Sequence, residues 1–264
     1  MPRRRAAHPA AATDWWATYF DDEYLVEFAP LFTPDGDRHE VAALLDALAL
    51  PVGGRLLDVP CGQGRHAHLL AEQGYDVTGL DYSRPLLARA KARGTGPRLR
   101  YVRGDMRALP ARWTGRFDAV CNLFTSFGFF GDPADDARTI AEFARVLAPG
   151  GLLAWHGGNR DGVMAKFVAR DAWTSRGRVR VEHERSFEPL EGILTIRTTL
   201  RRGRTAAMRT HRIRLYTPTR LAELCAAAGL VVERALDGWS GKPVHRRSPE
   251  LLLIARKPAR KPAR

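Results

Sequence analysis

The alternation of apolar and amphipathic segments along the chain predicts a sheet of mainly parallel strands. Five short segments with apolar or alternating side chains have the length of strands, at residues 54–59, 75–80, 98–103, 117–122 and 151–156. Segments of helical period separate several of these runs, near residues 64–73, 84–92 and 133–147. Strands that alternate with helices form doubly wound parallel sheets, whose ligands bind at the carboxyl ends of the strands. We therefore expect an α/β protein.

The segment before the first strand predicts two helices. Residues 13–32 are rich in aromatic side chains at helical spacing, and residues 38–49 have the pattern of a helix that ends before a proline. The simplest expectation for the first helix is that one of its faces packs on the core. That face would carry Trp15, Tyr19, Leu25 and Phe28.

Beyond residue 157 the hydrophobic pattern takes the period of strands. Alternating polar and apolar positions predict a three-stranded antiparallel meander, at residues 178–188, 192–202 and 206–216. Residues 218–228 predict a helix that Gly229 ends, and two closing strands follow near residues 230–237 and 249–256. We expect the meander to be an insertion, at about residues 172–216, in the α/β domain.

The most specific chemistry lies between the first two predicted strands. These strands end in Asp58 and Asp81, and a turn with Gly62 and Gly64 stands between them. Residues without a Cβ allow a tight turn from strand to helix and let a ligand approach the backbone and the helix N-terminus. A carboxylate at Asp58 would repel a dinucleotide pyrophosphate, whereas it would tolerate a ligand with an ammonium and a sulfonium. Asp81 suits the two hydroxyls of a ribose in either case.

A third acidic residue follows the third predicted strand. Asp105 can accept a hydrogen bond from an adenine amino group while the neighbouring Met106 packs on the ring. Three successive strand ends, each with an acid, therefore indicate S-adenosylmethionine (SAM). The alternative, in which each aspartate only caps a helix or a turn, requires three coincidences at these spacings.

Five segments resemble the motifs of the class I SAM-dependent methyltransferases. They cover about residues 50–157 in the family's order: LLDVPCGQG, VTGLDYS, RGDMRALP, FDAVCNLFTSFGFF and RVLAPGGLLAW. The resemblance implies a Rossmann-like, seven-stranded, mostly parallel sheet, whose last strand is antiparallel and lies beside the fifth. It also implies a helical lid at residues 13–50. Pro60 departs from the family's usual small residue, and its fixed φ and missing N–H donor would shift the loop around the methionine end.

The strand ends and the resemblance together assign eleven residues to the cofactor. These residues are Arg38, Asp58, Pro60, Cys61, Gly62, Gly64, Asp81, Tyr82, Asp105, Met106 and Asn122. The distance of Arg38 ahead of the glycine turn suits a contact with the methionine carboxylate, although a solvent-exposed arginine fits its position as well.

Few residues are needed for the methyl transfer itself. The reaction is an in-line displacement at a sulfonium, so positioning and exclusion of water can supply much of the catalysis. Where the acceptor carries a proton, a general base helps, and the candidate is His156, at the end of the fifth strand. Tyr19 is a second candidate catalytic residue, which could orient the acceptor from the lid. Candidate contacts to the acceptor are Tyr24, Phe124, Phe127 and Asn159. Plain packing would also explain these aromatic residues.

Composition and charge limit the alternatives. The 264 residues contain no apolar run long enough to span a membrane and no signal-peptide pattern. Three widely spaced cysteines indicate reduced thiols in a cytoplasmic protein, and we expect no metal site. The net charge of +13 includes three arginines near the N-terminus and five basic residues after residue 255. We expect residues 1–12 and 258–264 to be disordered, with a SAM-binding domain at residues 51–257.

These observations predict a methyltransferase that modifies nitrogen or oxygen of a small molecule and releases S-adenosylhomocysteine. The FTSFGFF segment is similar to a stretch in enzymes that methylate amino sugars, and the meander resembles elaborations that form a substrate wall or a homodimer interface. One alternative is an RNA methyltransferase whose arginine-rich meander follows a phosphate backbone. Against it, these arginines alternate with apolar residues, as on a half-exposed sheet. The other alternative is a protein that binds SAM without catalysis.

Overall fold

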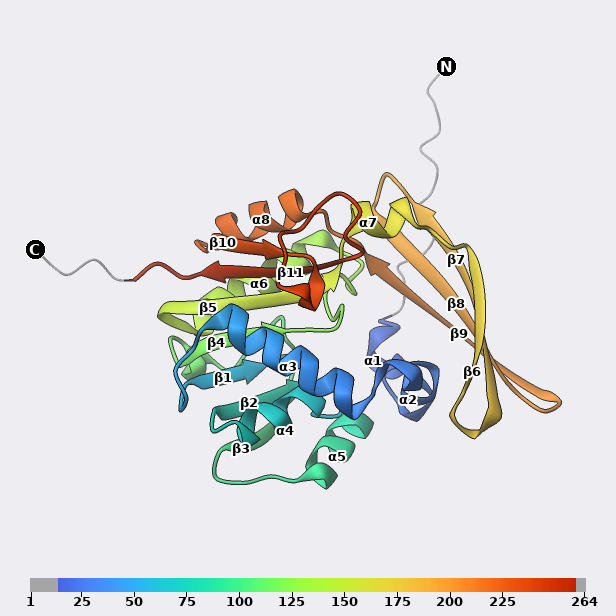
Figure 1. The fold of residues 1–264 in the computed structure, drawn as a ribbon, viewed down its shortest axis with the longest axis horizontal. Coiled ribbons are helices and arrows are strands. Elements are labelled where there is room, and N and C mark those ends of the chain that lie inside the picture. The colour runs from blue at the N-terminus through green and yellow to red at the C-terminus, as the bar shows by residue number, and fades with distance from the viewer. Residues whose placement is uncertain (1–13, 260–264) are drawn as a thin grey trace, which may run out of the picture.

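A computed structural model describes residues 14–259, which form two sheets (Figure 1). The larger sheet has the order β10-β11-β5-β4-β1-β2-β3. Its strands are β1 (Arg55–Asp58), β2 (Asp76–Asp81), β3 (Leu99–Arg103), β4 (Phe117–Asn122), β5 (Leu147–Gly158), β10 (Val231–Leu236) and β11 (Glu250–Arg256). Strands β1 to β5 are parallel, and β11 runs antiparallel beside β5. The predicted seven-stranded, Rossmann-like sheet is therefore confirmed.

Helices cover both faces of the larger sheet. They are α3 (Pro34–Leu48), α4 (Arg65–Glu72), α5 (Arg84–Arg93), α6 (Pro133–Val146) and α8 (Pro218–Ala227). Helices α3, α4 and α5 bury Leu44, Leu70 and Ala90 against one face, whereas α6 and α8 bury Phe143 and Leu221 against the other. This arrangement leaves the carboxyl ends of β1, β2 and β4 free to form a site.

The smaller sheet is antiparallel and has the order β6-β7-β8-β9. Its strands are β6 (Arg170–Ser175), β7 (Val179–Glu188), β8 (Ile193–Arg202) and β9 (Thr205–Arg214). The three predicted strands of the meander are present, but the prediction missed β6. Four of its six residues are exposed, so the segment lacks the apolar alternation of the other three strands. The short helix α7 (Arg160–Ala165) connects the two sheets.

The N-terminal segment is broken into short pieces, which corrects the prediction of one helix over residues 13–32. These pieces are α1 (Trp16–Tyr19), α2 (Asp22–Glu27) and the 3₁₀ turn η1 (Ala29–Leu31). Asp21 starts the second piece, because its carboxylate accepts a hydrogen bond from the Tyr24 N–H at 3.0 Å. Pro30 stands inside the 3₁₀ turn that follows. Figure 1 shows α1 and α2 between the two sheets.

Three further 3₁₀ turns complete the structure, η2 (Ala111–Trp113), η3 (Arg176–Arg178) and η4 (Gly238–Ser240). Within the described part of the chain, no helix is long and apolar enough to cross a membrane. The expected disordered ends fall almost wholly outside the described residues, so their state stays a prediction.

Candidate functional site

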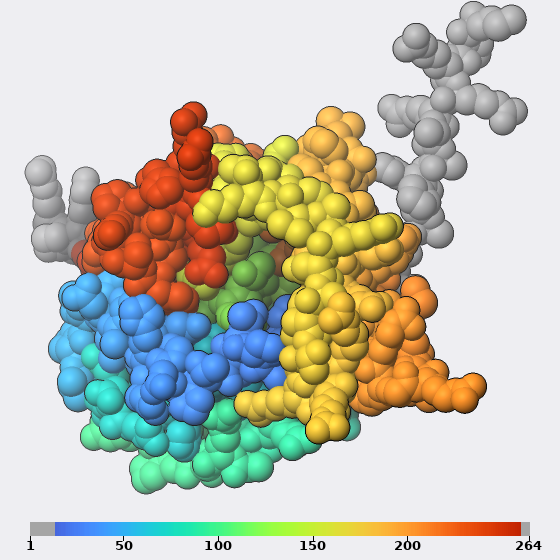
Figure 2. All heavy atoms as spheres, turned by 45° about the vertical axis from the view of Figure 1, so that its right-hand side comes forward, coloured from blue at the N-terminus to red at the C-terminus, as the bar shows by residue number. Residues whose placement is uncertain are grey.

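A pocket lies at the carboxyl ends of β1 and β2 and is closed by the N-terminal helices. Its lining comprises Trp16, Phe20, Tyr24, Pro60, Gly62, Leu80, Asp81, Tyr82, Ser83, Leu86, Gly104, Asp105, Met106, Ser126, Phe129 and Phe130. The lining thus combines predicted cofactor residues with aromatic side chains of α1, α2 and the loop after β4. Figure 2 shows the hollowed face of the molecule, bordered by the N-terminal helices in blue, the start of the smaller sheet in yellow and the C-terminal segment in red.

Asp81 fixes the glycine turn from the end of β2. Its two carboxylate oxygens accept hydrogen bonds from the backbone N–H groups of Gly62 and Ser83, each at 2.7 Å. Burial raises the pKa of Asp81 to about 6, so the group is ionised at neutral pH. The carboxylate lies in the pocket wall, where it can accept hydrogen bonds from ribose hydroxyls, as the sequence predicts.

The two glycines of the turn have different roles. Both have positive φ, 54° at Gly62 and 75° at Gly64. A Cβ at Gly64 would lie 2.4 Å from the hydroxyl of Tyr101, so close packing requires this glycine. At Gly62 the nearest atom to such a Cβ would be 3.9 Å away. Gly62 lines the pocket, and its bare backbone leaves room for a ligand.

Asp58 is a buried acid that lacks a full set of partners. It is 2% exposed, and its Oδ2 has no hydrogen-bond partner among the described residues. Burial raises its pKa to about 7. Asp58 lines neither hollow. Its unpartnered oxygen at the end of β1 nevertheless suits a cationic group such as the ammonium of SAM.

The residues after β3 form the adenine end of the predicted site. Asp105 is held by Arg107, whose Nη2 lies 2.7 Å from its Oδ2 and whose backbone N–H donates to its Oδ1 at 2.8 Å. Met106 is buried and lines the pocket beside Asp105. The guanidinium of Arg107 also stacks over Phe130, 4.4 Å from the ring centroid. Asp105 is thereby fixed at the pocket, as the predicted contact with an adenine amino group requires.

Aromatic side chains of the N-terminal helices close the pocket. Trp16 packs edge-on against Tyr82 and Phe130, with ring centroids 5.0 Å and 5.5 Å away. Phe20 and Tyr24 follow Trp16 at intervals of four residues and also line the pocket. Sequence analysis assigned Tyr24 to the acceptor but missed Trp16 and Phe20, although their spacing marks a second face of this segment.

A second hollow adjoins the pocket at the glycine turn. The two share Tyr24, Pro60, Gly62 and Ser126, and the second adds Phe32, Cys61, Gln63, Arg65, His66, Leu123 and Phe124. Arg65 is 5% exposed and bonds through Nη1 to Asp37 at 2.7 Å and Glu40 at 2.6 Å. Its Nη2 has no partner within the described chain. This buried donor suits a ligand carboxylate.

Arg38, the predicted partner of the methionine carboxylate, is placed differently. Its side chain is 61% exposed, pairs with Asp35 and lines neither hollow. Arg65 is the arginine that lines the second hollow, and it directly follows Gly64. Its position at the start of α4 is the signal that could have found it, because the first turn after a glycine-rich loop faces the ligand.

His156 lies under the loop after β4 and lines neither hollow. It is 3% exposed and stacks on Trp239 at 4.1 Å. Its Nδ1 accepts a hydrogen bond from the Phe124 N–H at 3.3 Å, and its Nε2 lies 3.3 Å from Glu250. Both ring nitrogens are therefore engaged within the protein, and the predicted role as general base has no support from this geometry.

The two tyrosines proposed for chemistry lie on opposite sides of the N-terminal segment. Tyr19 is buried, and its hydroxyl donates to Glu27 at 2.8 Å, away from the pocket. Tyr24 lines both hollows. Burial raises the pKa of Tyr24 above the usual range of phenols. Tyr24 is thus the tyrosine that can reach a ligand, as a neutral hydroxyl.

The remaining predicted residues divide between pocket and core. Asn122 is fully buried and donates to the Val59 carbonyl at 2.8 Å, which ties β4 to the glycine loop. Phe127 is 1% exposed and packs in the core, whereas Phe124 lines the second hollow. Asn159 is also buried and donates to the Ser248 carbonyl at 2.9 Å.

No cluster of three or more histidine, cysteine or acidic side chains that could hold a metal ion occurs in the part of the chain that the structure describes. Polar groups of the two hollows, together with the buried Asp58 at the end of β1, match the parts of one organic cation. Acids stand at the ends of β1 and β2 and after β3, with a buried arginine beyond the glycine turn. This combination of sheet and site defines the SAM-binding methyltransferase class.

Comparison with known proteins agrees with this class. A family model described as a methyltransferase domain matches residues 56–151. The dTDP-3-amino-3,6-dideoxy-alpha-D-glucopyranose N,N-dimethyltransferase of Streptomyces fradiae is 31% identical over 214 residues, 78% of this chain and 82% of that relative. The glycine/sarcosine N-methyltransferase of Halorhodospira halochloris is 38% identical over 112 residues, and the alignment covers only 42% of each chain.

The similarity to solved structures also extends over most of the chain. A crystal structure of a SAM-dependent methyltransferase from Clostridium acetobutylicum covers 90% of this chain and 98% of its own, with a TM-score of 0.75 at 16% identity. The chain belongs to the class I SAM-dependent methyltransferases, and its cofactor is SAM.

Proposed function

We propose that this protein transfers the methyl group of SAM to the amine nitrogen of a small molecule, and that amino sugars are the first acceptor class to test. The observation that carries the proposal is the 31% identity with a sugar N,N-dimethyltransferase across 82% of that relative's length. The fold and the pocket support the cofactor half of the proposal. The acceptor half rests on the relative.

In this proposal the chain's own residues hold the cofactor along both hollows. Asp81 accepts from the ribose hydroxyls, Asp105 from the adenine amino group, and Arg65 donates Nη2 to the methionine carboxylate. Asp58 balances the ammonium. When bound, the cofactor supplies a methyl group on a positively charged sulfur. The acidic lining favours that charge over a neutral ligand.

The acceptor nitrogen must be neutral to attack the methyl carbon. Tyr24 stays protonated at neutral pH because burial raises its pKa, so its hydroxyl can orient the acceptor without taking its proton. The amine then loses its proton to water before it attacks. Phe20, Phe124 and Phe129 exclude water from the reaction once the acceptor is bound.

Methyl-labelled SAM and three acceptors test the proposal. These are dTDP-3-amino-3,6-dideoxyglucose, the same sugar with a 3-hydroxyl in place of the amine, and total RNA. We expect label on the amino sugar alone, because only its nitrogen has a lone pair nucleophilic enough without a base. Label on the hydroxyl sugar would refute N-methylation, and label on RNA would refute a small-molecule acceptor. S-adenosylhomocysteine binding without any turnover on a wider panel of small amines would favour the non-catalytic alternative.

The charge distribution of the smaller sheet disfavours the RNA alternative. Several of its arginines are paired with acids of the same sheet: Arg201 lies 2.9 Å and Arg180 3.8 Å from Glu182, and Arg170 lies 3.2 Å from Glu184. Paired arginines release fewer counterions on binding a phosphate backbone, so they contribute less to affinity.

A further inference from the structure

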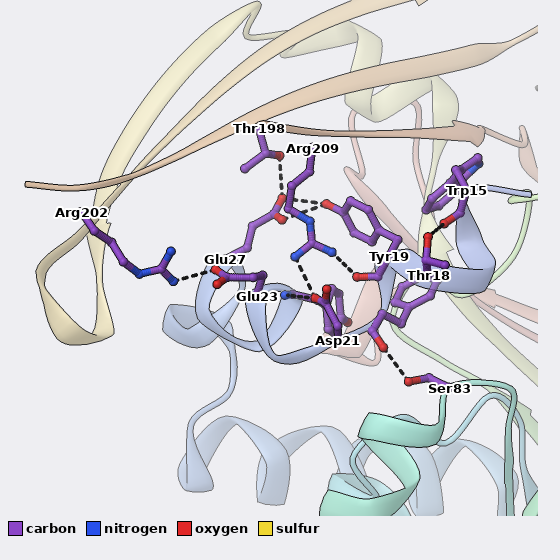
Figure 3. A network of polar contacts seen from close by, with 12 residues as sticks. Trp15, Thr18, Tyr19, Asp21, Glu23, Glu27, Ser83, Thr198, Arg202 and Arg209 are labelled. Carbon is purple, nitrogen blue, oxygen red and sulfur yellow. Dashed lines mark hydrogen bonds and ion pairs between the residues drawn. The ribbon is translucent and has the colours of Figure 1, made fainter. Parts of the chain in front are cut away.

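The N-terminal segment has two faces with different partners. Trp16, Phe20 and Tyr24 face the cofactor pocket. Tyr19 and Glu27 face the smaller sheet, where their side chains meet those of β7, β8 and β9. Figure 3 shows Thr198 of β8 and Arg209 of β9 beside them. The same short segment therefore lines the cofactor pocket with one face and contacts the smaller sheet, which lies far away in the sequence, with the other.

Glu27 is the centre of the contact with the sheet. It is fully buried, and its carboxylate accepts hydrogen bonds from the Tyr19 hydroxyl at 2.8 Å and the Thr198 hydroxyl at 2.8 Å. The Nε2 of His183 lies 3.0 Å from the same carboxylate. Burial alone would raise the pKa of Glu27, but these hydrogen bonds, with that of His183 first, lower it. An ionised carboxylate is thus held without a salt-bridging lysine or arginine of its own.

The orientation of His183 follows from its other neighbour. The Nη2 of Arg185 lies 2.8 Å from Nδ1 of His183, and a guanidinium can only donate. Nδ1 must therefore accept, which places the ring proton on Nε2 and directs it at Glu27. Arg185 is in turn held by Asp171 at 2.9 Å. The chain of donors that ends at Glu27 thus begins at Arg185 on β7, which Asp171 of β6 holds in place.

Other contacts hold the segment from both sides. On the side of the smaller sheet, Arg209 stacks over Tyr19 at 4.1 Å and bonds to Asp21 at 2.9 Å. On the side of the larger sheet, the hydroxyl of Ser83 donates to the Phe20 carbonyl at 2.5 Å. Ser83 lies two residues beyond Asp81, and its own backbone N–H is bound by that carboxylate. The N-terminal segment is therefore connected both to the smaller sheet and to Asp81, the residue predicted to bind the ribose.

We propose that Glu27 is a positioning residue: through Tyr19 it holds Trp16, Phe20 and Tyr24 over the cofactor, so that the smaller sheet sets how tightly and how long the cofactor is bound. Because Trp16 and Phe20 line the pocket from this segment, we expect the cofactor to leave when the segment moves, and that movement must break the hydrogen bonds of a buried carboxylate. The inference requires SAM binding alone and is independent of the acceptor.

Two substitutions test the proposal from different elements. Glu27→Gln removes the charge and one acceptor, and Thr198→Val removes a donor on β8, outside the pocket. The matched control is Glu23→Gln, which breaks an exposed ion pair of the same helix with Arg202. Dissociation of S-adenosylhomocysteine is followed by stopped-flow fluorescence, and its Kd by calorimetry. We expect the dissociation rate to rise at least tenfold in Glu27→Gln and severalfold in Thr198→Val, with no change in the control.

A double-mutant cycle separates positioning from general loss of stability. Phe20→Ala removes part of the cover, so it should raise the dissociation rate by itself. If Glu27 acts through the cover, Glu27→Gln adds little in that background, whereas independent effects would multiply. Unchanged dissociation in folded Glu27→Gln and Thr198→Val would overturn the proposal, as would fully multiplicative effects in the cycle. Should Glu27→Gln fail to fold, Thr198→Val and Tyr19→Phe decide by the same criteria.

Discussion

Asp58 offers the sharpest test of the cofactor site, because its charge state can be changed by pH as well as by substitution. Its carboxyl is 2% exposed, and burial raises its pKa to about 7. A cationic ligand binds the ionised form. About nine tenths of the group is ionised at pH 8 and about one tenth at pH 6, so cofactor affinity should fall about tenfold between these values.

The substitution Asp58→Asn removes both the charge and its titration. A hydrogen bond to a charged group contributes about 1.5–3 kcal/mol, so the variant should bind SAM about tenfold to a hundredfold more weakly at pH 8. Much of the dependence of cofactor affinity on pH should disappear in this variant. The remaining dependence at low pH should come from Asp81, whose pKa burial raises to about 6. Calorimetric titrations at pH 6, 7 and 8 measure both effects.

The same shift predicts that the variant without ligand is more stable than the wild type. A carboxyl whose pKa rises on folding holds its proton in the folded state over the range from about 3.8 to about 7, so its ionisation costs stability above that range. The cost is at most about 4 kcal/mol. Asp58→Asn avoids it and should raise Tm at pH 8. Asp76→Asn, an exposed partner of Arg100 near the opposite end of β2, is the control. Equal affinity and equal Tm for Asp58→Asn and wild type would refute the reasoning.

Three further predictions concern the same site. Arg65→Met should weaken SAM binding about tenfold or more in calorimetry, because it removes a charged hydrogen bond. Arg38→Ala should leave the affinity unchanged. The reverse result would show that Arg38, and not Arg65, binds the methionine carboxylate. His156→Gln should retain turnover within about tenfold, since loss of a general base costs about a hundredfold or more, and a larger loss in steady-state assays would return His156 to the chemistry. Gly64→Ala should lower Tm strongly, because the new Cβ would lie 2.4 Å from the Tyr101 hydroxyl. Gly62→Ala should fold and lose cofactor affinity. An equal Tm for both variants would contradict the packing argument.

The sequence predicts most of the larger sheet and its acids because both depend on local signals. Each of the first four strands has ordinary strand length and an apolar or alternating pattern, and each of the three acids stands at a strand end or within two residues of it. Parallel strands then bring the acids to one edge without further information. The strand β6 lacked this signal: its residues are mostly exposed, and they form a strand because the backbone of β7 pairs with them.

Which side chain faces a ligand depends on contacts that no local pattern specifies. Arg38 precedes the first strand and Arg65 directly follows the glycine turn. Helix α3 places Arg38 at the surface, while Asp37 and Glu40 of the same helix pair with Arg65 and hold it inward. His156 stands at a strand end, as predicted, yet alternation along β5 directs it to the face that Trp239 covers. The period of a strand fixes two faces, but only the tertiary structure shows which face meets the pocket.

The network around Glu27 is the extreme case, because Glu27 and its partner Thr198 are 171 residues apart in the sequence and belong to different parts of the fold. A glutamate in an aromatic segment, a histidine and a threonine have no common pattern in the sequence. Their meeting in one buried cluster follows from the insertion of four antiparallel strands after β5 and from the return of the N-terminal segment across them. If the insertion only supplied a wall for the acceptor, a fully buried carboxylate between it and the lid would be a needless cost. A link that transmits the state of the smaller sheet to the cofactor pocket accounts for that cost, and it places the control of cofactor exchange in the part of the chain that lies outside the shared methyltransferase domain.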